Sequence, residues 1–416
     1  MNRLILFTRQ YPFGVQESFL DTEIPYLAQG FNQVLIFPNE CGSGPRDVPV
    51  NVAVDTTFSL QRLGIFKTFF RALPSISLKL WLQEFRNNFK HYLSPRAFWR
   101  SLMYFEEAHR VQRLFNKLIE NEEVNLKKTV FYTYWLRGQA FGVSLIKEEF
   151  PQLVFISRAH GGDIYEERHE PPYLPFRNQI LKKLDRIFPI SQHGLDYLQN
   201  KYSEELKGAE IARLGVRDPG FRTSSSKDGV IRIASCSSVI KLKRLDLIIA
   251  SLSAFIDHFP DQKIAWDHLG DGPLKGQMID LAHRKLADKM PWLFHGQLSH
   301  QQVMEYYRSQ PVDLFLNLSS SEGIPVSIME AQSCGIPVVA AAVGGIPEIV
   351  SNRNGVLLPA HPKPELVAKA IFEAINDSAD RRNASRENWH KAFHADHNFQ
   401  EFVTKIKKLT QDIEYG

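Results

Sequence analysis

The sequence is poor in cysteine and contains no long hydrophobic run. Its three cysteines, Cys41, Cys236 and Cys334, are far apart and odd in number, so they form neither a disulfide framework nor a metal-ligand cluster. A reducing compartment is the simpler interpretation. The first apolar run, Leu4–Phe7, is too short for the core of a signal peptide, and no run approaches the length that crosses a bilayer. We therefore expect a cytoplasmic protein.

Strong charge of either sign and clustered carboxylates are missing as well. A formal net charge of +4 is too small to indicate a nucleic-acid partner by itself. No Asp-x-Asp triplet occurs in the chain, although an enzyme that holds a diphosphate through a divalent metal ion normally uses clustered carboxylates. We therefore expect no metal ion and no cofactor, with positive side chains and helix dipoles holding any anion. A hydrophobic content of 44% and a charged content of 23% are typical of a soluble globular protein.

Strand-like runs alternate with helix-like runs through most of the sequence, which indicates parallel sheets with helices on both faces. The predicted strands are Arg3–Thr8, Gln33–Pro38, Thr129–Thr133, Leu153–Ser157, Arg186–Ile190, Glu210–Leu214, Ile231–Cys236, Lys263–Leu269, Leu293–Gly296, Val312–Leu318, Pro337–Ala341 and Gly355–Leu358. The predicted fold class is α/β, with two doubly wound domains facing across a cleft. Ligands of such sheets lie beyond the carboxyl ends of the strands.

A length of 416 residues is enough for two or three domains. A stretch rich in turn and linker residues, 217–229, divides the chain. We predict a first domain at 1–220 with a helical, basic and aromatic insertion at 62–120, and a second domain at 221–395. Residues 396–416 are expected to form a C-terminal helix that can pack back on the first domain.

Two glutamates in the second half mark the strongest candidate site. Glu322 lies in a small polar loop after a predicted buried strand, and Glu330 lies about one and a half turns into the following helix. Pro325 suits the first turn of that helix. The N–H groups at the helix start favour a phosphate, and carboxylates accept hydrogen bonds from sugar hydroxyls. The arrangement predicts a site for a sugar joined to a diphosphate, although two acidic residues at this spacing also arise by chance.

Other loops that follow predicted strands hold further candidates. Lys243 and Arg244 lie near a helix start and could counter a diphosphate, or could be solvated surface charges. Gly270 lies in a Gly-Asp-Gly-Pro turn, a weak signal because such turns need glycine anyway. His160 precedes two glycines, so a ligand can approach the backbone there. The alternative is a core histidine that bonds a backbone carbonyl.

The first loop is a candidate for the acceptor side of a transfer site. The residues Tyr-Pro-Phe and Gly14 end the first predicted strand, and Glu17 is expected to open the helix that follows. Loops at the carboxyl ends of parallel strands carry binding residues, which is why we include both positions.

The insertion is both basic and aromatic. Residues 62–100 contain eight Lys or Arg and a single acidic residue, Glu84, with aromatic residues interleaved at helical spacing. Basic amphipathic helices can lie on an anionic membrane with their aromatic side down. The alternative is that the apolar faces dock on the domain core and the basic residues are solvated. Nucleic-acid binding is the least favoured option, because no recognised module accompanies the basic residues.

Together these residues resemble the retaining glycosyltransferases of the group 1 family (glycosyltransferase family 4), whose GT-B architecture has two Rossmann-like domains. The resemblance covers nearly the whole chain and is most specific over residues 231–360. The opening Tyr-Pro-Phe-Gly-x-x-Glu-x-Phe-Leu is similar to a bacterial branch associated with exopolysaccharide and lipopolysaccharide assembly. The family's usual Gly-Gly pair in this first loop is reduced here to Gly14.

The resemblance implies roles for the acidic and histidine positions. Glu322 would contact hydroxyls of the donor sugar, and Glu330 would contact the ribose of the nucleotide. His160 matches the family's His-Gly motif beside the donor sugar. The loop expected to hold the distal phosphate consists of Gly323, Ile324, Pro325 and Val326.

The resemblance also implies how the diphosphate is countered. Lys243 matches the family's phosphate-binding lysine. The arginine that the family usually has five residues earlier is replaced by Ser238, and Arg244 could partly substitute for it. This departure concerns one half of the expected clamp.

The implied activity is transfer of a hexose, with retention, from a nucleotide-diphosphate sugar to a glycan or lipid-linked acceptor in cell-surface polysaccharide synthesis. No metal ion and no nucleic acid are expected to take part. The protein would be cytoplasmic, with contact to the inner face of the membrane through 62–100. The alternatives are a nucleotide-sugar epimerase of the same architecture and a catalytically inactive sugar-nucleotide binding protein, which the serine at 238 would favour.

Overall fold

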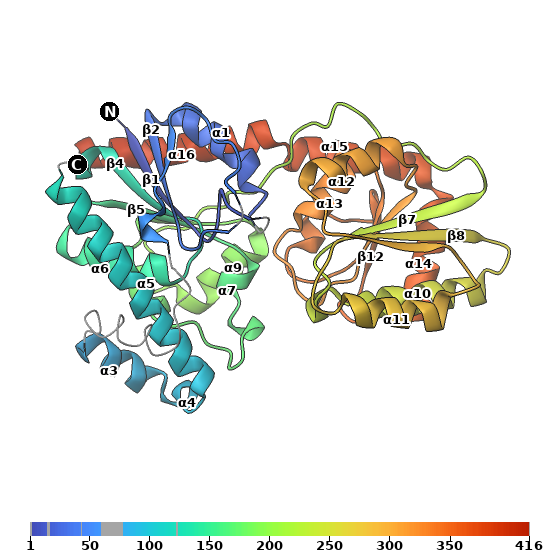
Figure 1. Ribbon diagram of the computed structural model, residues 1–416, viewed down its shortest axis with the longest axis horizontal. Helices are drawn as coiled ribbons and strands as arrows, with labels where there is room; N and C mark the ends of the chain where they lie inside the picture. Colours follow the sequence, from blue (N-terminus) through green and yellow to red (C-terminus); the bar gives the residue numbers. More distant parts are fainter. Residues whose placement is uncertain (1, 15–16, 43, 60–77, 122–123, 416) are drawn as a thin grey trace. The chain divides into compact units, whose positions relative to one another are not determined.

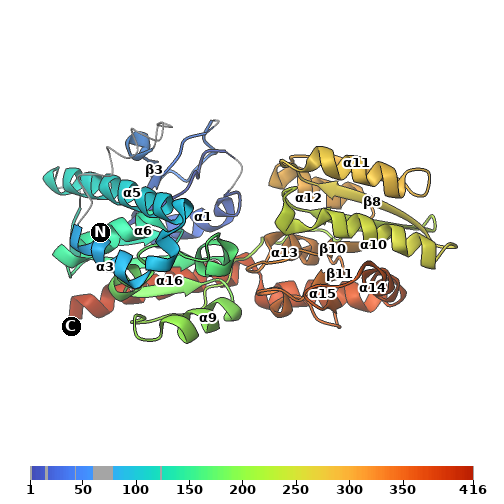
Figure 2. The ribbon, with the colours of Figure 1, turned by 90° about the horizontal axis from the view of Figure 1, so that it is seen from below.

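The computed structural model describes residues 2–14, 17–42, 44–59, 78–121 and 124–415. The chain forms two compact units, Met1–Ala212 together with Phe399–Gly416, and Arg213–Asn398. Helices flank a sheet in each unit, as Figures 1 and 2 show. The first part of the predicted insertion, 62–77, lies outside the described residues.

The first unit is built on six parallel strands in the order β3-β2-β1-β4-β5-β6. Its elements are β1 (Arg3–Thr8), α1 (Leu20–Gly30), β2 (Gln33–Pro38), β3 (Val52–Val54), η1 (Thr56–Phe58), α3 (Leu78–Asn87), α4 (Phe89–Tyr92), α5 (Pro95–Glu120), η3 (Leu126–Lys128), β4 (Thr129–Thr133), α6 (Gly138–Glu149), β5 (Val154–Ala159), α7 (Gly161–Ile164), η4 (Glu166–Arg168), α8 (Arg177–Lys183), β6 (Arg186–Pro189), α9 (Gln192–Tyr202) and α16 (Ala395–Tyr415).

Alternate side chains of these strands face different helices, as the two-residue period of a strand requires. Phe131 of β4 lies in the core that includes side chains of α5 and α6. The next residue, Tyr132, packs against Phe402 of α16, with ring centroids 5.7 Å apart. Figure 1 accordingly shows α1 and α16 on one side of the sheet and α5 and α6 on the other. Both faces are covered, so every residue of β4 is buried.

The second unit repeats the plan with six parallel strands in the order β12-β11-β10-β7-β8-β9. Its elements are β7 (Val230–Cys236), η5 (Lys241–Lys243), α10 (Leu245–His258), β8 (Lys263–Leu269), α11 (Lys275–Leu286), β9 (Trp292–Gly296), α12 (His300–Ser309), β10 (Leu314–Asn317), α13 (Val326–Ser333), β11 (Val338–Ala341), η6 (Ile346–Glu348), β12 (Gly355–Leu358), α14 (Pro364–Asn376) and α15 (Ser378–Ala392). In Figure 1, α12, α13 and α15 lie above this sheet, and α10, α11 and α14 lie below it.

The predicted fold class, α/β with two doubly wound sheets, is confirmed. One predicted strand, Glu210–Leu214, is wrong. This segment is extended beside β6, and the N–H of Glu210 donates to Ile187 O at 3.0 Å. It forms a single isolated bridge, at Ala209, and so does not become a strand of the sheet. One strand was missed, the edge strand β3, whose three residues are too few to produce a recognisable alternation.

None of the helices that the described residues form combines the length and the apolar character that crossing a membrane requires.

A buried ion pair lies between the sheet of the first unit and α16. Arg158 of β5 and Glu23 of α1 are 0% and 1% exposed as side chains, with Nε 3.2 Å from a carboxylate oxygen. Tyr132 donates a hydrogen bond of 2.9 Å to the same carboxylate. The guanidinium also donates to Ala212 O and lies 3.9 Å from the ring centroid of Phe402. A buried charge without its partner is costly, so these contacts depend on one another.

We expect Glu23→Gln to lower the free energy of unfolding by about 3–5 kcal/mol, because it leaves the Arg158 guanidinium buried without a counter-charge. The matched control is Glu170→Gln, which breaks an ion pair with Arg96 whose side chains are 86% and 69% exposed and should cost at most about 1 kcal/mol. Urea unfolding of both variants measures the difference. Equal losses would contradict the assignment of Arg158–Glu23 as a stabilising centre of this unit.

Candidate functional site

The two glutamates singled out in the sequence lie at the carboxyl end of β10. Glu322 is in the loop between β10 and α13, and Glu330 is in α13 itself. Pro325 is the N-cap of α13, and the helix begins at Val326. Both carboxylates are mostly buried, at 8% and 9% exposure. Charged groups are rarely buried without partners, so each needs a compensating contact.

Lys243 supplies that contact for Glu322. Its ammonium nitrogen lies 2.5 Å from Oε1 of Glu322, and the two side chains are 19% and 10% exposed. Lys243 ends the short η5 helix after β7, and β7 is the parallel neighbour of β10. The loops that follow the two strands therefore meet at one edge of the sheet. Ser320 N also bonds Leu242 O at 2.8 Å, which joins these loops through their backbones.

Arg244 adopts a left-handed conformation with φ 48°. Its guanidinium donates to Leu318 O, to Ser319 O at 2.8 Å and to Ala360 O at 3.0 Å. These carbonyls belong to the loops after β10 and β12. The side chain thus ties three loops of the edge together, and its predicted use as a second counter-charge for a diphosphate competes with these bonds.

A Gly-Gly turn after β11 supports the Glu322 loop from the other side. Gly344 has φ +55°, and a Cβ on it would lie 1.9 Å from the carbonyl oxygen of Glu322. The next residue, Gly345, donates its N–H to Gly323 O at 2.9 Å. Only a glycine lets the two backbones approach this closely. This contact joins loops that are far apart in the sequence, so no local motif marks it.

The second glutamate has a partner that sequence reasoning missed. His300, the first residue of α12, places Nδ1 2.8 Å from Oε1 of Glu330. Nothing in the local sequence marks His300, because its partner is 30 residues away in another helix. A histidine hydrogen-bonded in this way fixes the orientation of the carboxylate.

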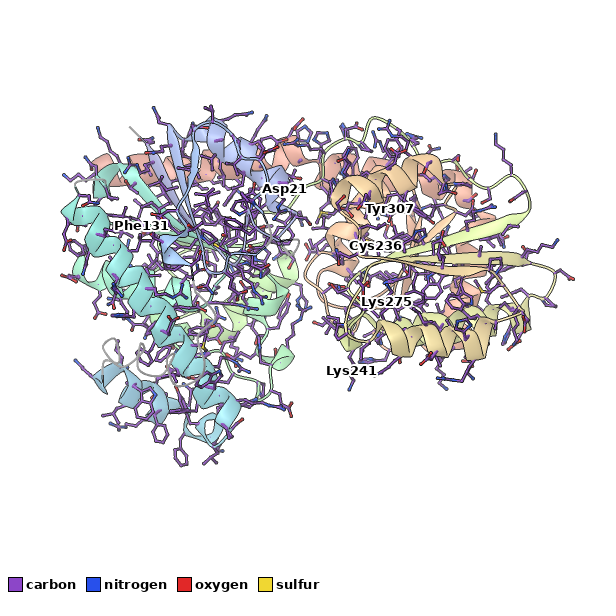
Figure 3. The ribbon with its side chains drawn as sticks, viewed as in Figure 1. Asp21, Phe131, Cys236, Lys241, Lys275 and Tyr307 are labelled. Atoms are coloured by element: carbon purple, nitrogen blue, oxygen red, sulfur yellow. The ribbon has the colours of Figure 1, made fainter. Side chains whose placement is uncertain are left out.

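The loops after β7 and β8 complete this edge. Gly270 has φ +151°, and a Cβ there would lie 1.9 Å from Ser237 O, so the loops are in direct backbone contact. Ser238 is exposed beside this contact. Cys236, Lys241 and Lys275, labelled in Figure 3, come from the end of β7, from η5 and from the start of α11. Within the second unit, the loops after β7, β8 and β10 that hold the predicted donor-side residues thus meet at one edge of the sheet.

The first unit holds His160 at the end of β5, where it is the N-cap of α7. The imidazole is 6% exposed and packs against Trp135 and Tyr134, with ring centroids 4.4 and 4.8 Å away. Both ring nitrogens lack a hydrogen-bond partner among the described residues. The carbonyl-bonded core histidine considered above is therefore not what forms. Its Nδ1 nevertheless lies 3.8 Å from a carboxylate oxygen of Asp163, so the histidine side chain faces that acid.

Asp163 fixes the backbone around His160. Its carboxylate accepts the N–H of His160 at 2.5 Å and that of Leu136 at 2.8 Å. Burial would raise the pKa of Asp163, but the hydrogen bonds and positive charges around it, with His160 foremost, hold its pKa below the usual value. The ionised carboxylate thus joins the loop after β4 to the loop after β5.

The structure gives Glu17 a different place from the predicted one. It does not open a helix, since α1 begins at Leu20. Its carboxylate is 1% exposed and accepts hydrogen bonds from the backbone N–H groups of Arg9, Gln10 and Tyr11. The indole N–H of Trp135 donates to it as well, at 2.5 Å. Glu17 therefore shapes the loop that contains Gly14, which has φ +63°.

The residues of this candidate site fall within a match to a known protein family. The family model described as glycosyl transferases group 1 matches residues 220–392, which include Lys243, Glu322 and Glu330. Within the second unit, the chain is thus similar to the group 1 glycosyltransferases. The recognition made from the motifs is confirmed.

Curated relatives match this chain over part of their length. It is 38% identical over 163 residues to sulfoquinovosyl transferase SQD2 of Arabidopsis thaliana, covering 38% of this chain and 29% of that protein. It is 25% identical over 279 residues to a D-inositol 3-phosphate glycosyltransferase of Nocardiopsis dassonvillei, covering 60% and 62%. The chain thus spans less than two thirds of the length of these curated relatives.

Solved structures establish the fold as GT-B. Sucrose-phosphate synthase from Thermosynechococcus elongatus is similar with a TM-score of 0.73 and 15% identity, covering 99% of this chain and 100% of that one. Anabaena HepE, solved with UDP and glucose, gives a TM-score of 0.67 at 16% identity, covering 97% and 99%. The lipopolysaccharide outer core galactosyltransferase WaaB gives 0.67 at 12%, also covering 97% and 99%.

The first unit also has a pocket that sequence reasoning missed. It has a volume of about 770 Å³ and lies beyond the carboxyl ends of β2 and β3, against α5. Among the described residues, its lining has basic and hydroxyl side chains and no carboxylate: Cys41, Thr56, Thr57, Phe58, Ser59, His109, Arg110, Arg113, Leu114 and Lys117. The three segments are far apart in sequence, so no local motif could reveal it.

We expect Gly344→Ala to destabilise the second unit by about 2–4 kcal/mol, the sum of a left-handed conformation and a backbone overlap with Glu322. Gly220→Ala is the matched control, because Gly220 also has a positive φ, +74°, but its Cβ would meet nothing within 4 Å. It should cost only about 1 kcal/mol. Urea unfolding of the two variants isolates the overlap. A Gly344→Ala protein as stable as the control would contradict the close support of the Glu322 loop.

Proposed function

We propose that this chain is a retaining glycosyltransferase that moves a hexose from a nucleotide-diphosphate sugar to a glycan or lipid-linked acceptor in cell-surface polysaccharide synthesis. The observation that carries the proposal is the Lys243–Glu322 pair beside the start of α13, within the residues that match the family model. A cation, an acceptor of hydroxyl hydrogen bonds and a helix N-terminus in one place suit a sugar diphosphate.

When the donor binds, Lys243 and Glu322 each exchange their contact with the other for a contact with the donor. The diphosphate approaches Lys243 and the backbone N–H groups of Gly323, Ile324 and Val326, with Pro325 shaping the start of α13 between them. Sugar hydroxyls take the place of the ammonium at Glu322. Because both side chains are already mostly buried and held at 2.5 Å, little further desolvation is needed when the donor enters. Glu330, oriented by His300, accepts hydrogen bonds from the ribose.

Transfer breaks the bond between the anomeric carbon and the diphosphate oxygen, and the leaving group departs with the electron pair. Negative charge then grows on the diphosphate, where Lys243 and the dipole of α13 stabilise it. The acceptor oxygen forms the new bond on the same face of the sugar, and its proton passes to the departing phosphate oxygen. Configuration is thereby retained without a covalent sugar–enzyme intermediate.

The first unit contributes His160 to the donor sugar. Its Nδ1 faces the Asp163 carboxylate, and its Nε2, which has no hydrogen-bond partner among the described residues, can bond a sugar hydroxyl. Gly14 and Glu17 remain proposed acceptor-side positions. Since the Glu17 carboxylate already accepts backbone and indole N–H groups, we propose that it acts through the shape of the loop.

The nucleotide to test first is UDP, because the HepE structures similar in fold contain UDP. A lipid-linked acceptor would place the reaction at the inner face of a membrane, so we also propose peripheral contact with that surface.

Replacing Lys243 with Ala should reduce kcat/KM for transfer at least about 100-fold, as expected when an electrostatic stabiliser of the leaving group is lost. Glu322→Ala should have a comparable effect through the sugar hydroxyls. The control is Lys275→Ala, at the start of α11, whose ion pair with Asp271 is partly exposed, at 30% and 41%; it should keep its activity. Activity is measured with labelled UDP-sugars and a membrane extract as acceptor source. Full activity of both site variants would contradict the assignment.

Donor binding should raise the free energy of unfolding by about 2.7 kcal/mol at a ligand concentration one hundred times the dissociation constant. A thermal-shift series with UDP-, GDP- and ADP-sugars measures this, and Lys243→Ala should remove the shift. Product analysis then separates the alternatives. An epimerase would isomerise the donor without acceptor, and an inactive binding protein would show the shift and no product. The absence of a shift with every nucleotide sugar would refute the donor site.

A further inference from the structure

An exposed apolar surface lies on α3, α4 and the first turns of α5, residues 78–100, here called the helical arm. Figure 1 shows α3 and α4 beside the start of α5, outside the sheet of the first unit. Seven large hydrophobic side chains are exposed among the described residues, and four of them belong to the arm: Leu82 (46%), Phe89 (52%), Leu93 (71%) and Phe98 (40%). Such a concentration on a short segment marks an interaction surface.

The arm is folded and anchored, so the exposure is a property of its outer side. Trp81 packs against Phe85, Tyr92 and Phe98, with ring centroids 5.8 to 6.4 Å apart. Trp81 and Trp99 also pack against the core of the first unit. The sequence left open whether the apolar side chains meet a membrane or the core. The structure divides them between an inner set, which docks on the core, and an outer set.

The only acidic side chain of the arm is turned inward. Glu84 accepts hydrogen bonds from the Tyr173 hydroxyl at 2.5 Å and from Phe176 N at 3.0 Å. Burial raises the pKa of Glu84 against the effect of these bonds. The carboxylate thus holds the arm to the segment before α8 and contributes little negative charge to the outer surface.

The outer surface carries cations. Lys79, Arg86 and Lys90 are exposed and form no ion pair with any other described residue. Arg96 pairs with the exposed Glu170, and Arg100 donates to backbone carbonyls, including Pro171 O at 3.3 Å. The three unpaired cations therefore lie within the same short segment as the exposed apolar side chains.

We propose that the helical arm docks on an anionic lipid surface, with Leu82, Phe89, Leu93 and Phe98 entering the interfacial layer and Lys79, Arg86 and Lys90 contacting headgroups. Aromatic and aliphatic side chains next to unpaired lysine and arginine are the pattern of interfacial helices, and negative headgroups attract such cations. The inference deepens the proposed function, because it supplies the surface on which a lipid-linked acceptor is reached.

Vesicle sedimentation of the full chain tests the proposal. Binding to vesicles of phosphatidylcholine with phosphatidylglycerol should exceed binding to phosphatidylcholine alone by at least about tenfold, given three cations near the surface. It should fall as salt is raised, because salt screens exposed charges. Equal binding to both vesicles, or no binding to either, would overturn the proposal.

Two variants of the arm separate its two contributions. Phe89→Asp with Leu93→Asp should reduce binding to anionic vesicles at least about tenfold, and Lys79→Gln with Lys90→Gln should reduce the salt dependence. The matched control is Leu293→Asp with Leu366→Asp, two other exposed hydrophobic side chains, at 52% and 42%. It should bind as the unaltered chain does. Arm variants that bind like the control would also refute the proposal.

Two further measurements keep the result interpretable. Circular dichroism and the thermal shift with UDP-sugar should be unchanged in the arm variants, because the arm is remote in sequence from the donor-binding loops. Vesicle binding requires neither donor nor transfer, so a failure of the proposed function and a failure of arm docking are seen in different assays. If the arm variants keep their binding to vesicles but lose binding to nucleic acid, the arm binds nucleic acid, and the proposal of a lipid surface is rejected.

Discussion

The parallel pairing of β7 with β10 is the constraint on which the candidate site depends. Parallel neighbours end at the same edge of a sheet, so the loops that follow them meet although many residues separate them in sequence. This brings Lys243 to Glu322 and lets the Gly344 turn after β11 close against the same loop. The positive end of the α13 dipole then lies beside the Lys243–Glu322 pair, whose side chains are mostly shielded from water. The chemistry proposed for the site follows from this topology more than from any single side chain.

The two units use buried ion pairs for different ends. Arg158–Glu23 is almost completely excluded from water and is joined by a tyrosine hydroxyl and a backbone carbonyl. A pair closed on all sides can do little except hold elements together. Lys243–Glu322 keeps 19% and 10% of its side chains exposed, which leaves room for a ligand to exchange with it. Exposure at this level distinguishes a structural pair from one that can take part in binding.

The sequence was sufficient to predict both sheets and the loop–helix junction of Glu322 and Glu330. The alternation of strands with helices also predicted that the strands are parallel. These features are local, because a buried run, a turn and a helix start leave adjacent signals. Contacts between distant segments were not predictable. His300 as the partner of Glu330, the Gly344 overlap and the carbonyls bound by Arg244 all join residues whose proximity depends on the completed sheet. The position of Glu17 was predicted wrongly because an acidic residue before a helix resembles a helix-start signal. Its carboxylate instead accepts hydrogen bonds from four N–H groups, those of Arg9, Gln10, Tyr11 and the Trp135 indole.

The short contact between Lys243 and Glu322 has a consequence for selectivity. In the unliganded site the Lys243 ammonium is already paired with the Glu322 carboxylate. Inorganic phosphate would have to displace that carboxylate from Lys243 and would leave it without hydrogen-bond donors, so the site should bind phosphate weakly. A molecule that brings an anion and several hydroxyl donors together satisfies both residues at once. Crowded surroundings rich in free phosphate would then leave the site largely empty until the complete molecule arrives.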